Sequence, residues 1–274
     1  MSAQIIDGKK IAQEILEDVK TEIDKNSLEV KLDIVQIGND EATNIYIKHK
    51  VARASEVGIK TQVHKYDDSV SQEEVLNLIT KLNVDSTVTG FFIQTPIPKH
   101  LDLSVLVSAI DPKKDVDGMN PYNLGRLLHG SANALVSATA IACLTALKHT
   151  NVSLPGKHAV IVGRSAIVGK PLMGLLLAKD CTVTICHSKT QNLKEICKTA
   201  DILVTATGKP GLITADFVKS GAVVIDCGSP KAEVEFEGVK DIAGYITPVP
   251  GGIGPLTIAS LLKNCIKTLR NNYE

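Results

Sequence analysis

The segment Ala159-Val-Ile-Val-Gly163-Arg-Ser165-Ala-Ile-Val-Gly169-Lys-Pro171 decides the fold of this 274-residue chain. Its opening apolar run is typical of a buried strand in a parallel sheet. Gly163 follows where the chain must turn sharply, and the residues from Val168 onward indicate the start of a helix. A buried strand, a tight turn and a helix start form the context that a dinucleotide-binding fingerprint requires.

The spacing of this segment departs from the usual G-x-G-x-x-G pattern. Ser165 replaces the second glycine, and Gly169 falls one residue late. Both residues are still small enough for the backbone to approach a pyrophosphate, whose charge a helix N-terminus favours. The spacing alone leaves an ordinary strand-to-helix turn as an alternative.

The end of the next expected strand favours NADP as the dinucleotide. NAD enzymes usually place a carboxylate there to hold the ribose hydroxyls, whereas residues 186–190 read Cys-His-Ser-Lys-Thr. Arg164, Ser188 and Lys189 can instead meet a 2′-phosphate through charge and hydrogen bonds. The alternative is that Lys189 is a solvated loop lysine.

Outward from this segment, strand and helix patterns alternate along the whole chain, which predicts an α/β protein with mainly parallel sheets. The expected strands are 32–37, 62–66, 88–93, 158–162, 182–186, 202–206 and 223–226. The expected helices are 11–23, 41–57, 71–82, 140–149, one from 168, 192–199, 215–219 and 256–269. Residues 111–133 are rich in Gly, Pro and Asn and are expected to be irregular, with the domain crossover near Ser137. We therefore expect two α/β domains, the second a Rossmann-like, doubly wound sheet.

Composition excludes several classes of partner. Lys plus Arg equals Asp plus Glu at 30 each, so no net field attracts nucleic acid or an acidic membrane. Charges interrupt the first ten residues, and no apolar run approaches the roughly 18 residues of a membrane span. The six cysteines show neither a C-x-x-C pair nor Cys/His ligand spacing, so neither disulfides nor a metal site are expected. These features predict a cytoplasmic protein.

Five separated motifs resemble the methylenetetrahydrofolate dehydrogenase/cyclohydrolase family. They are Val35-Gln-Ile-Gly-Asn-Asp40 followed by Tyr46 and Lys50, Ile93-Gln-Thr-Pro-Ile-Pro98, Lys114-Asp-Val-Asp-Gly118, Gly163-Arg-Ser165-x-x-Val-Gly169-x-Pro171 and Tyr245-Ile-Thr-Pro-Val-Pro-Gly-Gly-Ile-Gly-Pro255. They occur in family order and together span most of the chain.

The resemblance implies how the domains divide the work. Residues 1–136, completed by the C-terminal helix 256–274, would form a catalytic, folate-binding domain, and residues 137–255 an NADP-binding domain. The active site would lie in a cleft between them. The resemblance also implies a homodimer, a place in purine biosynthesis, and two reactions. Methylenetetrahydrofolate is oxidised with NADP to methenyltetrahydrofolate, which water opens to 10-formyltetrahydrofolate.

The family's catalytic and substrate-binding residues correspond here to Tyr46, Lys50, Gln94 and Asp117. Tyr46 and Lys50 are four residues apart and share one helix face. A lysine in a dry cleft loses its proton more easily, as hydrolysis requires, and Gln94 would orient it or the water. Asp117 would accept two N–H bonds from the pterin edge, with Asp115 holding the turn, although the two aspartates could exchange roles.

Two loops complete the expected site. The backbone of Pro250, Gly251, Gly252, Ile253 and Gly254 would approach the substrate closely. The expected cofactor residues are Gly163, Arg164, Ser165, Val168, Gly169, Ser188 and Ser229.

The chain departs from the family's usual residues at three places. Ser137-Ala-Thr139-Ala-Ile-Ala142 replaces Pro-x-Thr-Pro-x-Gly, Thr95 replaces Leu, and Ser229-Pro230 replaces Ile-Asn. These changes leave two alternatives to the bifunctional NADP enzyme. One is a dehydrogenase without the hydrolytic step, linked to NADP or NAD, and the other is a non-catalytic folate- or NADP-binding scaffold.

Overall fold

The computed structural model describes residues 2–271, which form two compact units. One unit comprises residues 2–13 and 139–260 and contains a six-stranded sheet; the other comprises 14–138 and 261–271 and contains a three-stranded sheet. We call them the six-stranded unit and the three-stranded unit.

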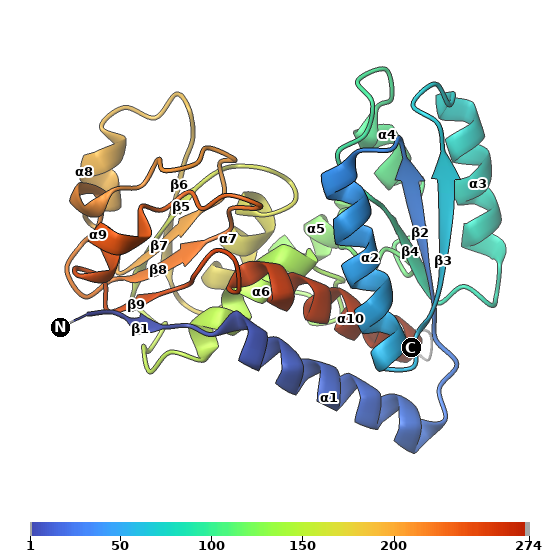
Figure 1. Ribbon diagram of the computed structural model, residues 1–274, viewed down its shortest axis with the longest axis horizontal. Helices are drawn as coiled ribbons and strands as arrows, with labels where there is room; N and C mark the ends of the chain where they lie inside the picture. Colours follow the sequence, from blue (N-terminus) through green and yellow to red (C-terminus); the bar gives the residue numbers. More distant parts are fainter. Residues whose placement is uncertain (1, 272–274) are drawn as a thin grey trace. The chain divides into compact units, whose positions relative to one another are not determined.

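All strand pairs of the six-stranded unit are parallel, in the order β1-β9-β8-β7-β5-β6 (Figure 1). Its strands are β1 (Gln4–Ile5), β5 (His158–Val162), β6 (Thr182–Cys186), β7 (Ile202–Thr205), β8 (Val223–Asp226) and β9 (Tyr245–Ile246). Its helices are α6 (Ala138–Lys148), α7 (Gly169–Leu177), α8 (Leu193–Cys197), α9 (Phe236–Lys240) and the 3₁₀ helix η1 (Ala215–Phe217). Every residue of β7 and β8 is buried, as expected for central parallel strands covered on both faces.

The three-stranded unit has parallel strands in the order β3-β2-β4. They are β2 (Lys31–Ile37), β3 (Lys60–Tyr66) and β4 (Gly90–Ile93). Helices α2 (Glu41–Glu56), α3 (Gln72–Val84), α4 (Leu103–Ser108) and α5 (Pro121–Leu128) belong to this unit, whereas α1 (Gly8–Asn26) and α10 (Ile253–Asn271) contribute residues to both units. Asp40 caps α2 by accepting from the Thr43 N–H, and Ser71 with Glu74 forms a capping box at the start of α3.

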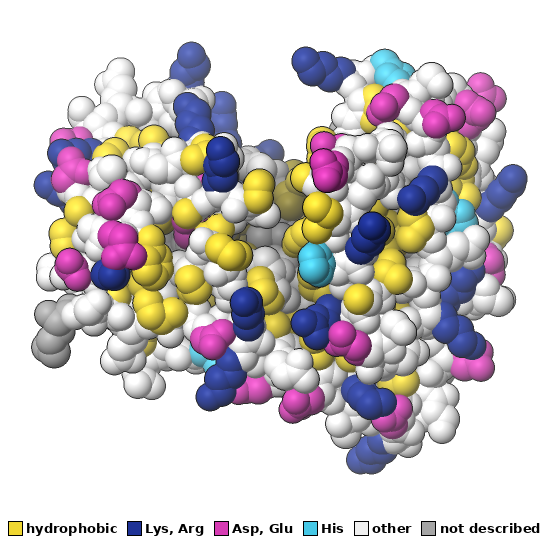
Figure 2. Space-filling model, in the orientation of Figure 1, with side chains coloured by type: hydrophobic (Ala, Val, Ile, Leu, Met, Phe, Trp, Pro, Cys, Tyr) yellow, Lys and Arg dark blue, Asp and Glu magenta, His cyan; other side chains and the backbone are white. Residues whose placement is uncertain are grey.

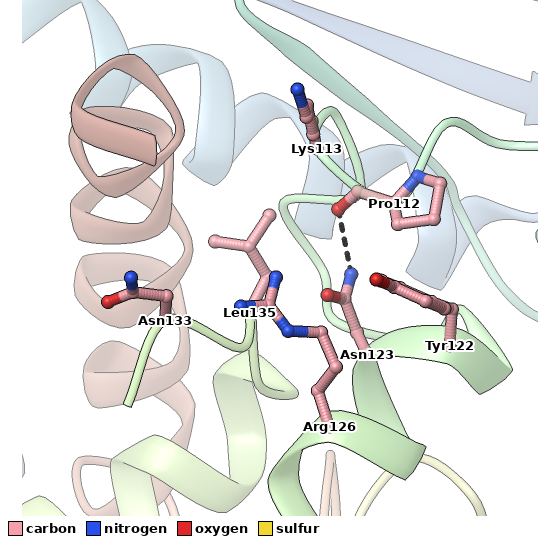
Figure 3. A pocket seen from close by; sticks show the side chains of 7 residues that line it. All are labelled: Pro112, Lys113, Tyr122, Asn123, Arg126, Asn133 and Leu135. Carbon is pink, nitrogen blue, oxygen red and sulfur yellow. Dashed lines mark hydrogen bonds between the residues drawn. The ribbon is translucent and has the colours of Figure 1, made fainter. Parts of the chain in front are cut away.

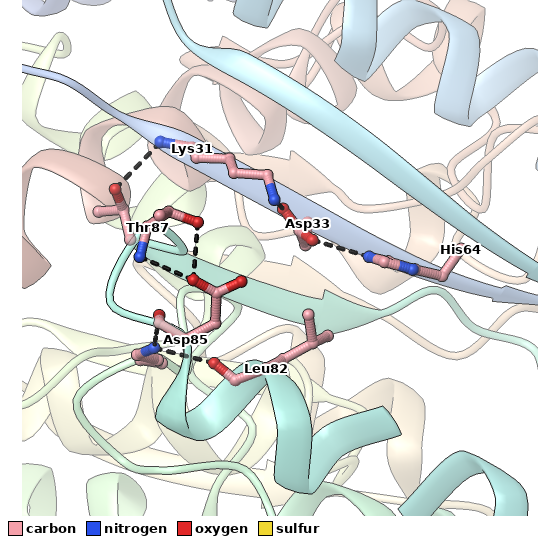
Figure 4. A network of polar contacts seen from close by, with 8 residues as sticks. Lys31, Asp33, His64, Leu82, Asp85 and Thr87 are labelled. Atoms are coloured by element: carbon pink, nitrogen blue, oxygen red, sulfur yellow. Dashed lines mark hydrogen bonds and ion pairs between the residues drawn. The ribbon is translucent and has the colours of Figure 1, made fainter. Parts of the chain in front are cut away.

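A polar network lies on the three-stranded sheet (Figure 4). Asp33 on β2 is fully buried and pairs with His64 Nε2 on β3 at 2.7 Å and with Lys31 Nζ at 3.5 Å. Lys114 Nζ donates to the carbonyl oxygens of Leu82 and Asp85, at the C-terminal end of α3. These two bonds tie the loop that carries the two candidate aspartates to the end of α3.

The structure corrects several expectations. Residues 111–133 are not irregular throughout, because Asn120 caps α5 and Pro121 occupies its first turn. Helices α4 and α9 and the two-residue strands β1 and β9 were not expected from the sequence. The pairing of β1 with β9 places residues 2–13 in the six-stranded unit rather than with the rest of 1–136. The last helix begins at Ile253 instead of 256.

Within residues 2–271, no helix is long and apolar enough to cross a membrane. Over the same range, no group of three or more His, Cys, Asp or Glu side chains is arranged to hold a metal ion. All six cysteines are free thiols, and five of them are buried. Basic and acidic side chains are interspersed over the face shown in Figure 2, in keeping with the balanced composition.

Candidate active site

Helix α2 brings a lysine into the interior of the three-stranded unit. Its buried residues are Thr43, Ile47, Lys50 and Ala54, spaced three or four apart as expected for one inward helix face. Lys50 therefore occupies a position where an apolar side chain would be expected, and only 5% of it is exposed. A buried lysine is rare in proteins unless it is paired or has a function.

The contacts of Lys50 come from α2 and from β4. Its Nζ donates to Gln94 Oε1 at 2.9 Å and lies 4.2 Å from the ring centroid of Phe92 and 5.1 Å from that of Tyr46. Gln94 follows directly after β4, and its Nε2 donates to the carbonyl of Thr95 at 2.7 Å. That second bond fixes the amide with its oxygen toward Lys50. Sequence reasoning found three of these residues and missed Phe92, whose ring faces the ammonium.

Burial shifts the pKa values of Lys50 and Asp117 toward neutral pH. Burial lowers the pKa of Lys50 from 10.5 to about 8, opposed by the negative charge of Asp117. Burial raises the pKa of Asp117 to about 6, opposed by the positive charge of Lys50. Burial and the charge of Asp117 raise the pKa of the Tyr46 hydroxyl to about 12. Tyr46 therefore stays neutral, whereas Lys50 can gain or lose a proton near pH 8.

The two candidate aspartates have different surroundings. Asp115 is 1% exposed, and its carboxylate accepts from the N–H groups of Met119 and Asn120 and from Asn123 Nδ2. It holds the turn, as the sequence favours. Asp117 is partly buried, and its charge shifts the pKa of Lys50. Asp117 therefore remains the candidate for substrate binding, because Asp115 is occupied by the turn.

The loop between β5 and α7 fits a pyrophosphate. Gly163 has φ +139°, and a Cβ there would lie 2.3 Å from the carbonyl oxygen of Ala206. A Cβ on Gly169 would lie 2.0 Å from the carbonyl oxygen of Gly163, so only glycine allows this close turn. Ser165 Oγ accepts from the N–H of Val168 at 3.0 Å and so shapes the entry to the helix.

The surroundings of this loop suit a 2′-phosphate. After β6, residues 187–190 form a turn in which the His187 N–H donates to Thr190 Oγ, with no carboxylate in the turn. Arg164, Ser188 and Lys189 are exposed. None of the three forms an ion pair within residues 2–271. Unpaired cations and a hydroxyl are the groups expected for binding a phosphate.

A buried acidic network shapes the neighbouring loops, and sequence reasoning missed it. Glu233 accepts from Thr207 N and Gly208 N, while Asp226 accepts from Gly228 N, Glu233 N and Val234 N. These bonds fix the backbone after β7 and β8, including the segment with the exposed Ser229. In the sequence, Glu233 looks like one acidic residue of a polar loop.

Two glycines of the 250–254 loop have an intramolecular role that the sequence did not indicate. Gly251 has φ +109°, and Gly252 packs its carbonyl against Gly8, where a Cβ would lie 1.9 Å away. Only Gly254 faces open space among the three. This loop belongs to the six-stranded unit, whereas Lys50, Gln94 and Asp117 belong to the three-stranded unit.

Comparison with known proteins assigns the chain to a family. The catalytic-domain model of the tetrahydrofolate dehydrogenase/cyclohydrolase family matches residues 6–117, and its NAD(P)-binding-domain model matches residues 137–273. The chain belongs to this family.

Relatives match over nearly the whole chain. The bifunctional protein FolD of Agathobacter rectalis is 44% identical over 278 residues, 98% of this chain and 99% of the relative. The bifunctional FolD of Campylobacter jejuni has a TM-score of 0.95 at 36% identity, covering 99% of this chain and 100% of that structure. The structure of Trypanosoma brucei FolD, solved with NADP and an inhibitor, has a TM-score of 0.95 at 31% identity. The match covers 100% of this chain and 99% of that structure.

Membership in the tetrahydrofolate dehydrogenase/cyclohydrolase family confirms the expected fold class of two α/β units with parallel sheets. It also confirms the predicted enzyme, an NADP-dependent dehydrogenase and cyclohydrolase, over the two alternatives.

Proposed function

We propose that the Lys50 site carries the chemistry of both reactions on the folate. The enzyme oxidises 5,10-methylenetetrahydrofolate to 5,10-methenyltetrahydrofolate with NADP and hydrolyses the product to 10-formyltetrahydrofolate. The observation that supports this site is a buried lysine with a pKa of about 8, held by Gln94 beside the rings of Tyr46 and Phe92.

Hydrolysis needs a group that takes and returns a proton. Water attacks the methenyl carbon only as its proton is removed, and the ring nitrogen leaves only as it gains one. A side chain with a pKa of about 8 exists in both forms near neutral pH, so Lys50 can serve both steps. Gln94 Oε1 holds the Nζ in place through the 2.9 Å bond.

Asp117 and Tyr46 position the substrate in this proposal. A carboxylate accepts two parallel N–H bonds from the amide-like edge of a pterin, and Asp117 is the aspartate that the turn does not use. Tyr46 contributes a neutral ring beside Lys50, suited to stacking on the flat substrate.

Oxidation demands positioning more than proton transfer. NADP, when bound, supplies the acceptor for the two electrons that the substrate loses. The chain would hold its pyrophosphate at Gly163, Ser165, Val168 and Gly169, and its 2′-phosphate at Arg164 and Ser188. Ser229 would lie beside the cofactor, and residues 250–254 would supply the backbone that approaches the folate.

The wider setting is also proposed. The enzyme would be a homodimer in the cytoplasm that serves purine biosynthesis, with the folate as its small-molecule partner and neither nucleic acid nor membrane bound. Six free thiols suit a reducing compartment, and the balanced charge suits a protein without polyanionic partners.

Hydrolysis of methenyltetrahydrofolate by Lys50→Met tests the assignment. The variant should lose at least about a hundredfold in hydrolysis rate, the range of general acid–base catalysis, and keep its NADP affinity. Lys48→Met is the matched control, because Lys48 is exposed on the same helix. Hydrolysis by Lys50→Met at the unmodified rate would remove Lys50 from the mechanism.

A further inference from the structure

A cavity of about 330 Å³ lies in the three-stranded unit and contains none of the residues assigned to folate or NADP. Figure 3 shows its wall: residues from α5, from the 112–113 segment before it and from the 133–135 segment after it. The lining residues are Pro112, Lys113, Tyr122, Asn123, Arg126, Asn133 and Leu135. A volume of this size is at the lower end of pockets that hold small organic ligands.

The charges on the wall are all positive. Lys113 and Arg126 are its charged residues, and within residues 2–271 neither forms an ion pair with a carboxylate. Among the described residues, the Arg126 guanidinium makes one hydrogen bond, from Nη2 to Ser131 Oγ at 3.0 Å, although it carries five N–H groups. The Tyr122 ring, 5.9 Å from the guanidinium carbon, braces the side chain.

A third cation adds to the positive potential. Lys267 on α10 donates to the carbonyl oxygens of Ala132 and Ala134, in the segment that lines the cavity. Burial lowers the pKa of Lys267, and the charge of Arg126 lowers it further, so these two cations are close neighbours. Placing like charges together costs free energy unless an anion compensates.

The neighbouring carboxylates do not supply that compensation. Asp115 is buried, and its oxygens already accept from Asn123 Nδ2 and from the backbone N–H groups of the turn. Asp111 turns one oxygen to the backbone N–H of Lys113, not to its ammonium. Asn123 donates to the carbonyl of Pro112 at 2.8 Å and to Asp115, so the polar floor is rigid (Figure 3).

We propose that this cavity is a second small-molecule site, which binds an organic anion bearing a phosphoryl or carboxylate group against Arg126 and Lys113. The planar guanidinium fork grips either group through two parallel bonds, and Lys113 adds a point charge. The Tyr122 ring, which is 60% exposed, offers an apolar flank for the organic part.

Calorimetry on the full chain with saturating NADP tests the proposal, because NADP fills the other phosphate site. Three probes separate the sources of the charge: pyrophosphate, 5′-AMP and citrate. At least one should bind, and its Kd should rise at least about tenfold in both Arg126→Gln and Lys113→Gln, as expected for the loss of a charged contact. Arg270→Gln is the control, because it removes the same charge from an exposed pair with Glu22.

The outcomes are distinct. Binding of pyrophosphate or 5′-AMP alone assigns a phosphorylated ligand, and binding of citrate alone assigns a carboxylate ligand. No binding of any probe at about 10 mM, well beyond ordinary metabolite affinities, or binding that both variants leave unchanged, overturns the proposal. If Arg126→Gln does not fold, Lys113→Gln decides alone, since its side chain is exposed. Lys113→Gln should keep both folate reactions at unmodified rates, so this test is independent of the Lys50 assignment.

Discussion

Lys50→Met should make the enzyme more stable while it loses hydrolysis. The fold lowers the pKa of Lys50 from 10.5 to about 8, which corresponds to about 3 kcal/mol against the charged form at neutral pH. Methionine has a similar length and no charge, so the variant escapes this cost. It leaves Gln94 Oε1 without its donor, a loss of about 1 kcal/mol. The net gain in the free energy of unfolding should be about 2 kcal/mol at pH 7.

The pH dependence gives the sign of the effect. Because the folded pKa lies below the unfolded one, the unfolded chain binds more protons between about pH 8 and 10.5, and stability rises with pH there. The loss of unfolding free energy caused by burying the charged Lys50 is therefore complete below pH 8. It should shrink by about 2 kcal/mol between pH 7 and 9.5. The advantage of Lys50→Met should shrink by the same amount over this range.

Urea unfolding of both proteins at pH 7 and 9.5 measures this. Lys48→Met should change stability by less than about 0.5 kcal/mol at either pH, because Lys48 is exposed. A Lys50→Met protein that is less stable than the unmodified enzyme at pH 7, or whose advantage does not change with pH, would refute the buried, charge-disfavouring environment of Lys50.

Three further predictions concern binding. Asp117→Asn should slow both reactions and leave the NADP affinity unchanged. Asp115→Asn should lower the free energy of unfolding in urea by about 1–3 kcal/mol, because its turn loses acceptors for N–H groups. Equal effects of the two variants on stability would contradict the assigned roles. NADP should be preferred over NAD at least about tenfold in kcat/KM, and the preference should fall in the Arg164→Ala, Ser188→Ala double variant. Equal kcat/KM for the two cofactors in the unmodified enzyme would contradict the assignment of the 2′-phosphate to Arg164 and Ser188. Gly163→Ala should raise the Kd for NADP and destabilise the fold by about 1–3 kcal/mol, because the φ of +139° at this residue disfavours any side chain. Unchanged NADP binding in calorimetry would contradict the role of Gly163 in the cofactor loop.

The central strands were predictable because their signal is local. Residues 158–162 and 223–226 are mostly apolar runs that end at turn residues, and the structure has strands at the same bounds. The edge strand at 182–186, in which Thr alternates with apolar residues, also has the expected bounds. Helix caps were equally readable, since an N-cap oxygen binds a backbone N–H only two or three residues away. For α2 the sequence offers Asn39 or Asp40 as the cap, and the structure uses Asp40. For α3 the Ser71/Glu74 pair forms the capping box that its spacing indicates.

The features that sequence reasoning missed depend on distant partners. Strand β1 has two residues and exists only because β9, some 240 residues later, pairs with it. The ring of Phe92 on β4 matters because Nζ of Lys50 on α2 lies 4.2 Å from its centroid, and no local sequence pattern joins these two residues. Glu233 looked like a loop carboxylate, yet its partners lie on the turn after β7. The periodicity of α5 was hidden by its short length and by Gly125.

The measurement that tests the central claim most directly follows two absorbance signals in one reaction, those of reduced cofactor and of methenyltetrahydrofolate. Given methylenetetrahydrofolate and NADP, the unmodified enzyme should form reduced cofactor while methenyltetrahydrofolate stays low, because the Lys50 site hydrolyses it. Lys50→Met should let methenyltetrahydrofolate accumulate. Accumulation of methenyltetrahydrofolate by the unmodified enzyme, or no reduced cofactor at all, would contradict the account.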